Sequence, residues 1–347
     1  MAATMKDVAE RAGVSIATVS FVINNTKRVT PETRLRIETA MADLGFRRNV
    51  VARALASRRT RIIALVYPAL EHRIGGSIAD FITSAARASS EADYHLVVWP
   101  ISNDATELTA LVGQGLVDGV LLMEVQLEDA RVEVLRGLDI PFALIGRTRD
   151  VSGLDYVDID FDTSMQLAMD HLIELGHRET VLLSGSQEKI SYRLYGPYER
   201  EEAAYRRITE ENGMRPIVMR CAQSAAGGRE AAARLTAEAP EATAVLAADE
   251  ASAAGLVAGL HQLGRRIPAD LSVISVLNSK EMAAVSDPPL TLVVAPGLEL
   301  GALGVEALLR RLEGGTPQEP VLRAGILEMG ESTGPVQRQT ARRRRPT

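Results

Sequence analysis

The chain is poor in cysteine and in aromatic residues. Cys221 is the one cysteine among 347 residues, so no disulfide can form within the chain. Such usage fits a reducing compartment, although a lone cysteine also serves as ordinary core packing. No apolar run approaches the roughly 18 residues that a membrane span requires. Charges between Lys6 and Arg11 interrupt any apolar segment of a secretory signal. We therefore expect a cytoplasmic protein with no membrane partner.

Sequence signals of catalysis and of cofactor binding are missing as well. The chain holds no glycine-rich dinucleotide fingerprint and no phosphate-binding loop. Ser184-Gly185-Ser186 lacks the flanking pattern of a nucleophile elbow. We predict that the protein is not an enzyme and that it takes no cofactor.

Two groups of potential metal ligands have simpler explanations. His171 and His177 are six residues apart, a spacing that does not place them on one helical face. A histidine-arginine pair after a helix-ending glycine is more often a charge partner of the helix C-terminus. Asp158, Asp160 and Asp162 alternate along the chain. A solvated strand edge at the crossover between the lobes explains this pattern more simply than a calcium-binding site. No metal site is predicted.

Charge is distributed unevenly along the chain. The net charge is −6, but residues 1–61 carry twelve basic and five acidic side chains, a net +7. The remainder carries 27 basic and 40 acidic side chains, a net −13. This asymmetry is typical of a nucleic-acid-binding module attached to a body that repels nucleic acid. With 46% hydrophobic residues, the chain is long enough for a small module and a larger two-lobed unit.

Residues 1–46 carry the start and stop signals of short helices. Residues 4–7 have the spacing of a capping box, and Gly13 can end the helix that follows. Ser15 can cap a second helix over residues 16–24. Only a Gly-Val-Ser turn separates the two helices, which predicts a helix-turn-helix.

A third helix is predicted to begin at Thr30-Pro31 and to end at Gly45. Proline is harmless in the first turn because its missing N–H would be unpaired there. Spacings of four and three residues predict a buried stripe of Ile37, Met41 and Leu44.

The second helix has a face suited to reading DNA. We expect Val19, Val22 and Ile23 to pack against the neighbouring helices. Small apolar residues at this spacing also occur in plain three-helix cores. The local +7 charge favours DNA, because phosphate neutralisation supplies much of the binding free energy. The face predicted to be open to the major groove carries Ala17, Ser20, Phe21 and Asn24.

Residues 47–60 join the basic module to the acidic body. Their centre, residues 50–56, has no glycine or proline, unlike a flexible tether. Asn49 stands before it as a natural N-cap. Because a helix of about two turns is marginal in water, we expect this segment to become helical only on contact with a partner.

Beyond residue 60, apolar runs of strand length alternate with helical stretches. Continuous apolar runs are typical of strands buried on both faces of parallel sheets. The length of the region predicts more than one doubly wound lobe. The strand runs are residues 62–66, 96–98, 120–122, 142–145, 181–183, 244–246 and 273–276, and the helical stretches include 77–92, 164–175, 199–211 and 250–263.

The first 55 residues resemble the lactose-repressor (LacI/GalR) family of transcription regulators. The matching segments are residues 7–20, 30–34, 44–46, 49 and 51–55. In that family the second helix reads the major groove. The hinge folds on the operator, pairs with its copy through a face that here includes Ala52, and inserts a leucine, here Leu55, into the minor groove. The DNA-binding residues that follow from the helix pattern and the resemblance are Thr4, Ser15, Ile16, Ala17, Thr18, Ser20, Phe21, Asn24, Arg28, Thr30, Thr33, Asn49, Ala52, Arg53 and Leu55.

One position in the second helix departs from the family. Where the family usually has an arginine, which can bind a guanine edge, this chain has Phe21. A phenyl ring can pack on a thymine methyl but donates no hydrogen bond. The operator should therefore differ at that base pair.

The resemblance extends over essentially the whole core. It implies a three-helix headpiece at 1–46, a hinge helix or linker at 47–60, and a two-lobed periplasmic-binding-protein-like core with parallel sheets at 61–337. The landmarks are residues 118–120, 140–141, 171–178, 249–250, 267–273, 287–291 and 331–335. The lobes are expected at 61–160 plus 292–321 and at 161–291 plus 322–337, before a basic, disordered tail at 338–347.

The predicted effector cleft departs most from the family. Polar and aromatic groups common in the family are replaced here. Several of them bind sugar hydroxyls in relatives, so the replacements remove hydrogen-bonding partners that a buried polyol needs. A simple sugar is therefore less well supported than the family suggests. The replacements fall at Ala69, Ile74, Gly75, Glu201, Ala248 and Leu277-Asn278.

Aromatic and basic residues concentrate between residues 189 and 200, in a chain with only 4% aromatics. Two explanations remain open. The segment is either a solvent-exposed loop or a cavity wall in which Tyr192, Tyr195 and Tyr198 stack on a ligand ring and Arg193 holds an anionic or hydroxylated group. The candidate effector-binding residues are Tyr67, Ile74, Gly75, Tyr192, Arg193, Glu201, Asp249 and Asn278.

The residues and the resemblance together predict a homodimeric, effector-controlled transcription regulator, most often a repressor, acting in the cytoplasm at the nucleoid. Its partners would be a pseudopalindromic double-stranded DNA operator, a second copy of the chain, and a small molecule such as a sugar or sugar derivative. A family regulator controlled by a protein or by nothing is the nearest alternative. A solute-binding receptor is less well supported, because the headpiece is basic. The arginine-rich tail is either simply solvated or adds nonspecific DNA affinity.

Overall fold

The computed structural model describes residues 3–24, 27–46, 59–68, 74–103, 105–188 and 193–337. The chain forms two compact units, Met1–Thr60 and Arg61–Thr347. Six sites predicted from the sequence lie outside the described residues, at Asn49, Ala52, Arg53, Leu55, Ala69 and Tyr192, as does the tail. Within the described part, no helix is both long and apolar enough to cross a membrane.

The first unit is built from three helices, α1 (Met5–Ala12), α2 (Ile16–Asn24) and α3 (Pro31–Asp43). The capping box is present, because Thr4 Oγ1 accepts from the Asp7 nitrogen at 3.3 Å and the Asp7 carboxylate accepts from the Thr4 nitrogen at 2.8 Å. Gly13 ends α1 in the left-handed conformation, with φ 65°. Ser15 Oγ accepts from the Thr18 nitrogen at 3.1 Å and so starts α2.

The three helices share one small apolar core. Val19, Val22 and Ile23 are buried as predicted, and they pack in the same cluster as Ile37. The prediction was wrong for Leu44, which is 37% exposed. It lies just past the last residue of α3, so the helical spacing that would bury it no longer applies.

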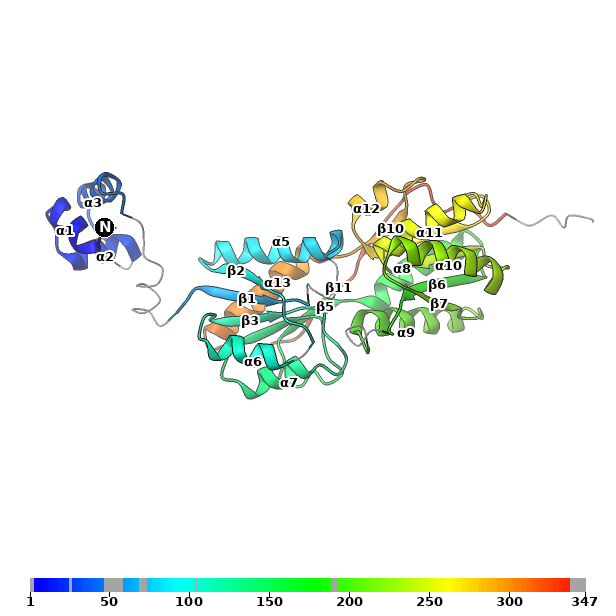
Figure 1. Cartoon of the computed structure of the whole chain (residues 1–347), viewed down its shortest axis with the longest axis horizontal. Helices are drawn as coiled ribbons and strands as arrows, with labels where there is room; N and C mark the ends of the chain where they lie inside the picture. Colours follow the sequence, from blue (N-terminus) through cyan, green and yellow to red (C-terminus); the bar gives the residue numbers. More distant parts are fainter. Residues whose placement is uncertain are drawn as a thin grey trace, which may run out of the picture. The chain divides into compact units, whose positions relative to one another are not determined.

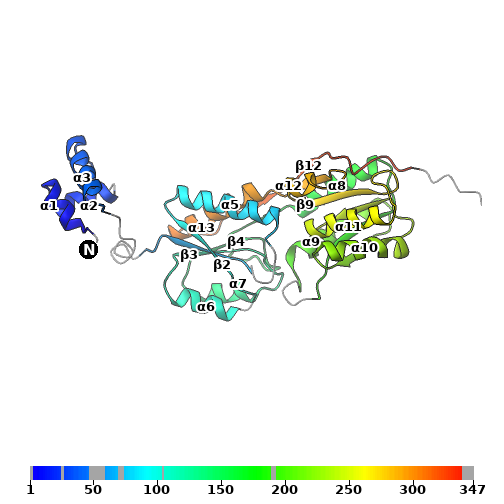
Figure 2. The same cartoon turned by 45° about the horizontal axis from the view of Figure 1, so that its top comes forward.

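The second unit contains two sheets, each flanked by helices on both faces (Figure 1). The first sheet is entirely parallel, with the order β11-β5-β4-β3-β1-β2. Helices α5 and α13 lie side by side on one face, and α6 and α7 cover the other (Figures 1 and 2). The elements are β1 (Ile62–Val66), α5 (Gly76–Glu91), β2 (His95–Trp99), α6 (Ala105–Gly113), β3 (Gly119–Leu122), α7 (Ala130–Gly137), β4 (Phe142–Ile145), β5 (Tyr156–Ile159), α13 (Gly297–Leu312) and β11 (Val321–Arg323).

The second sheet has the order β12-β10-β9-β8-β6-β7, parallel except for the β10–β12 pair. Helices α8 and α9 pack on one face, and α10 and α11 on the other. The elements are α8 (Phe161–Glu174), β6 (Thr180–Gly185), α9 (Gly196–Glu211), β7 (Val218–Cys221), α10 (Ala225–Glu238), β8 (Ala244–Ala247), α11 (Glu250–Gln262), β9 (Ser272–Asn278), α12 (Lys280–Ala284), β10 (Thr291–Val294) and β12 (Ile326–Glu328).

The chain passes between the two lobes after β5, after β10 and after β11. Because β10 belongs to the second sheet and β11 to the first, the lobe limits predicted at 291/292 and 321/322 fall inside strands. Both limits therefore shift a few residues towards the C-terminus. The burial expected for the run at 96–98 was also wrong, since β2 is an edge strand with Val97 37% and Val98 36% exposed.

Candidate functional site

The start of α2 presents exposed side chains on the headpiece. Ser15, Ile16 and Ala17 are exposed, with Ile16 at 49%. Ser20 and Phe21 are half-buried, as is Thr18, whose hydroxyl lies 2.8 Å from Ser15 Oγ. The Asn24 side chain lies outside the described part. The predicted reading residues are thus accessible, while Val19, Val22 and Ile23 anchor the opposite side of the helix in the core.

A cation lies against the unusual Phe21. The Lys27 ammonium is 4.9 Å from the centre of the Phe21 ring, within the range of a cation–π contact. Lys27 was not among the predicted DNA-binding residues, although its place directly after the reading helix was a signal for it. The ring thus brings a positive charge to the position where the family usually has arginine.

The remaining predicted contacts lie at helix starts and in the exposed turn before α3. Thr4 and Thr30 are N-caps, and the Thr30 hydroxyl donates to Thr33 Oγ1 at 2.9 Å. Arg28 is exposed. Helix N-termini favour phosphate because their N–H groups and dipole attract anions. The arrangement is therefore suited to contacting the DNA backbone on either side of the reading helix.

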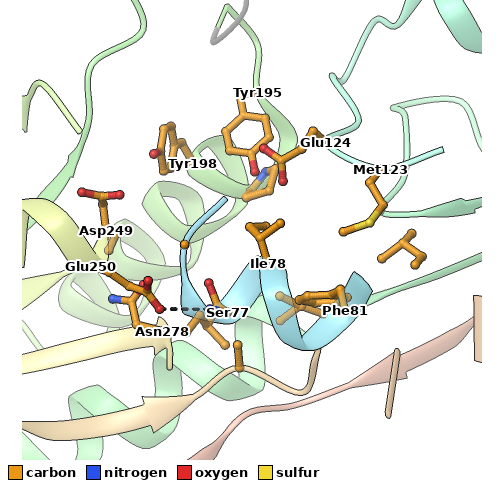
Figure 3. Close-up of a pocket in the computed structure, with 18 of the residues that line it drawn as sticks. Ser77, Ile78, Phe81, Met123, Glu124, Tyr195, Tyr198, Asp249, Glu250 and Asn278 are labelled. Atoms are coloured by element: carbon orange, nitrogen blue, oxygen red, sulfur yellow. Dashed lines mark hydrogen bonds between the residues drawn. The ribbon is translucent and has the colours of Figure 1, made fainter. Parts of the chain in front are cut away.

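A cavity of about 440 Å³ lies between the lobes of the second unit, with Tyr67, Ile145 and Asn278 among the side chains at the carboxyl ends of its strands. This is where open parallel sheets bind ligands. Figure 3 shows Ile78, Phe81 and Met123 on the side of the first lobe and Tyr198 and Asp249 on the side of the second.

Six predicted effector-binding residues line this cavity, and one does not. The lining includes Tyr67, Ile74, Gly75, Glu201, Asp249 and Asn278. Arg193 is exposed and absent from the lining, so nothing in the cavity supports its predicted role in holding a ligand. Its carbonyl oxygen instead accepts from Gln126 Nε2 at 2.8 Å. The backbone there joins the lobes, and the arginine side chain points to solvent.

Tyr195 and Tyr198 form part of the cavity wall rather than a solvated loop. Each is 7% exposed and lines the cavity, and their rings meet edge to face with centres 4.9 Å apart. The loop explanation was therefore wrong for this pair. Tyr195 is the N-cap residue of α9 and Tyr198 lies in its first turn, so the helix fixes both rings.

The lining is acidic. Five carboxyl groups contribute to it, and no lysine, arginine or histidine occurs among the lining residues that the structure describes. Two of the five stood among the predicted effector residues, Glu201 and Asp249. The three that were not among the predicted effector-binding residues are Glu124, Asp158 and Glu250.

Asp158 is buried, contrary to the expected solvated strand edge. It is 4% exposed in β5, between β4 and β11, and burial raises the pKa of its carboxyl to about 6, with Arg200 and Arg147 opposing the shift. Its Oδ2 lies 3.6 Å from Arg147 Nε and 3.9 Å from Arg200 Nη1. Since Arg200 belongs to α9 and Arg147 to the first lobe, this cluster links the lobes.

Glu201 and Asp249 face the cavity from the second lobe. Burial, followed by the charge of Asp249, raises the pKa of Glu201 well above its ordinary value. Burial likewise raises the pKa of Asp249, although its Oδ1 accepts from the Ser252 nitrogen at 2.8 Å as the N-cap of α11. The cavity therefore disfavours a second negative charge.

His171 and His177 both have hydrogen-bonding partners in the second lobe, and His171 Nε2 lies 2.9 Å from Thr333 Oγ1. His177 is 2% exposed, its Nδ1 lies 2.9 Å from Thr243 Oγ1 and its Nε2 lies 3.0 Å from the Gly334 oxygen. Burial lowers the pKa of His177. The expected role of His177 as a charge partner of the helix end was therefore wrong, and Arg178 alone caps α8 by donating to the Ile173 oxygen at 3.0 Å. Among the described residues, no group of three or more potential metal ligands comes together.

Comparison with known proteins decides the family. Residues 4–49 match the bacterial regulatory proteins of the lacI family, and residues 169–333 match a periplasmic binding protein-like domain. The HTH-type transcriptional regulator DegA of Bacillus subtilis (strain 168) is 32% identical over 316 residues, covering 87% of this chain and 89% of DegA. The chain belongs to the lacI family of bacterial regulatory proteins.

Two solved structures match nearly the full length of this chain. The transcriptional regulator CelR in complex with cellobiose is 27% identical, with a TM-score of 0.71 and coverage of 95% of this chain and 99% of CelR. The Lac repressor bound to ONPG in its repressed state is 26% identical, with a TM-score of 0.80 and coverage of 96% and 100%. This lacI-family chain is a DNA-binding transcriptional regulator with a helix-turn-helix headpiece.

Proposed function

We propose that the protein is a homodimeric repressor that binds a pseudopalindromic operator and responds to a small molecule in the interlobe cavity. The proposal rests on one observation: the same chain has an exposed DNA-reading helix and a cavity large enough for a small ligand. A ligand can control DNA binding only by favouring one arrangement of the core over another. A cavity bounded by both lobes is suited to that role.

Exposed apolar side chains on the surface of the second unit support a dimer. Val285 is 76%, Ile326 68% and Met329 65% exposed. Exposed patches of large apolar side chains mark sites of contact with other proteins. A second copy would bring two headpieces to one DNA, and its twofold symmetry would be mirrored in the operator.

The cavity supports a small-molecule effector over control by a protein or by nothing. Its 440 Å³ and its fixed aromatic wall are features of ligand sites. CelR is described in complex with cellobiose, and a sugar or sugar derivative is the proposed effector class here too. The basic headpiece favours a regulator at the nucleoid, in the cytoplasm, over a solute receptor or an enzyme.

Selection from random double-stranded DNA with the full chain tests the proposal. We expect enrichment of two inverted half-sites, a dimer by sedimentation on the selected DNA, and a change in affinity on adding the effector. Enrichment of no sequence, or binding of one chain to a single half-site, would contradict it.

A further inference from the structure

One carboxyl group in the interlobe cavity has a buried oxygen with no hydrogen-bond partner among the residues that the structure describes. Glu201, on α9, is 3% exposed and lines the cavity, and its Oε2 is buried without a hydrogen-bond partner. A buried acceptor left unsatisfied is costly, and a buried unpaired charge more so. Glu201 is therefore stabilised when a molecule in the cavity donates hydrogen bonds to it.

The other four lining carboxylates have partners of their own, which distinguishes Glu201 from a merely acidic surface. Glu250 accepts from three backbone N–H groups, Asp249 caps α11, Asp158 lies beside two arginines, and Glu124 interacts with the Tyr195 hydroxyl. These partners hold the side chains in place. They leave Glu201 as the acceptor for a ligand.

Among the residues that the structure describes, the charged groups that line the cavity with Glu201 are all carboxyls. Asp249 approaches from the start of α11, and Glu124 and Asp158 line the same cavity from the first lobe. The two arginines near the cavity, Arg147 and Arg200, lie against Asp158 and are not part of the lining. An anionic ligand would be repelled, and a cation would be attracted.

Resting on the proposed function of this cavity, we propose that the effector carries a protonated amine, bound by Glu201 and Asp249, on a ring that packs against Tyr195 and Tyr198. An ammonium group has three donors, no acceptor and a compact positive charge. It satisfies the Glu201 acceptor and offsets the surrounding negative charge in one contact. Aromatic rings on the wall favour a cationic ring ligand further.

A neutral sugar satisfies these groups less well. A hydroxyl donates one hydrogen bond and carries no charge, so it does not stabilise a Glu201 carboxylate beside Asp249. In that case Glu201 remains protonated and acts as a donor itself. Binding of an amine and binding of a neutral sugar should therefore depend on pH in different ways.

The direction in which affinity changes with pH distinguishes an amine ligand from a neutral ligand. Burial and Asp249 raise the pKa of Glu201 in the free protein, and an ammonium favours the carboxylate. Binding of an amine should therefore release a proton, and affinity should rise with pH until the amine itself deprotonates. Binding of a neutral ligand to protonated Glu201 should weaken as pH rises. Asp249 and Asp158 titrate in the same cavity, so the comparison with Glu201→Gln isolates the contribution of Glu201.

Calorimetric titration of the full chain tests this inference. The probes are glucosamine and galactosamine, their parent sugars glucose and galactose, and putrescine as an amine without a ring. We expect one amino sugar to bind at least tenfold more tightly than its parent sugar, with proton release. Glu201→Gln should remove that preference and the proton release that accompanies binding of the amino sugar. Glu210→Gln, the same substitution on an exposed part of α9, should change nothing.

Four outcomes would overturn the inference. They are equal affinity for amino and parent sugars, preference for an anion such as gluconate, tight binding of putrescine alone, and no binding of any amine. Operator selection with the same preparation separates this inference from the proposed function. If the protein selects a palindromic operator but prefers glucose to glucosamine, the proposed function stands and the amine effector is contradicted. If it selects no operator, the proposed function itself is contradicted.

Discussion

The Glu250 carboxylate, at the start of α11 in the second lobe, accepts a 2.8 Å hydrogen bond from the backbone nitrogen of Gly76, at the start of α5 in the first lobe. The same carboxylate accepts from Ser77 at 3.1 Å, drawn as a dashed line in Figure 3, and from Ser279 at 2.7 Å. Gly75 provides no side-chain cap for α5, so the other lobe supplies it. Capping of the first turn of α5 therefore requires that the two lobes lie close together.

Glu250→Ala should destabilise the core and weaken effector binding together. The substitution leaves the first N–H groups of α5 without their acceptor, and loss of a helix cap costs about 1–2 kcal/mol. Urea unfolding of the core and calorimetry of the effector measure the two effects. Glu281→Ala, at an exposed position on α12, is the matched control. Equal losses in both variants would argue against an interlobe cap.

Phe21→Arg should shift the operator towards guanine at one base pair of each half-site. Arginine can bind the O6 and N7 atoms of guanine, and each such pair contributes about 1–3 kcal/mol of discrimination. Selection from random DNA measures the preference. Leu35→Arg adds the same charge on α3, where Leu35 is 65% exposed, and should raise affinity without changing the sequence preference. An unchanged preference in Phe21→Arg would show that residue 21 does not face a base.

Leu55→Ala should weaken operator binding far more than nonspecific binding. The resemblance assigns Leu55 as a minor-groove wedge, whose unstacking of bases is offset by hinge pairing and DNA bending. Titrations of operator and of random DNA at one salt concentration measure the two affinities. Ala56→Gly, the next residue, controls for general loosening of the segment. Equal losses on both DNAs would refute the wedge.

Asp158→Asn should change the pH dependence of stability. The carboxyl has a pKa of about 6 in the folded core against an ordinary 3.8, because it is buried. Between these values the folded state binds more protons than the unfolded state, so the contribution of Asp158 to stability falls as pH rises from about 4 to 6 and is constant above that. The full effect is about 3 kcal/mol.

Unfolding in urea at several pH values between 4 and 7 measures this effect as the difference between wild type and Asp158→Asn. Asp162→Asn serves as the control, because Asp162 is exposed and pairs with Arg207 at the surface. Identical pH profiles for wild type and Asp158→Asn would mean that the pKa of Asp158 is the same in the folded and unfolded states.

The headpiece helices and several strands of the core could be predicted because their determinants are local. Thr4 with Asp7, Gly13 and Ser15 each form their caps within three residues, so spacing alone located the helices. Continuous apolar runs identified strands such as β1 and β9. Leu44 shows the limit of spacing, because a helix end moves its side chain out of the stripe.

Tertiary structure alone decided the chemistry of the cavity. Asp158 lies in a segment of alternating aspartates, and its burial depends on β11, which arrives beside β5 from far later in the chain and pairs Leu322 with Asp158. Glu201 and Asp249 come from different helices, and their proximity has no local signal. Tyr195 rather than Arg193 lines the cavity because α9 begins directly after Tyr195. Local spacing determined which elements form, whereas the charge that the effector meets depended on which distant segments the fold brings together.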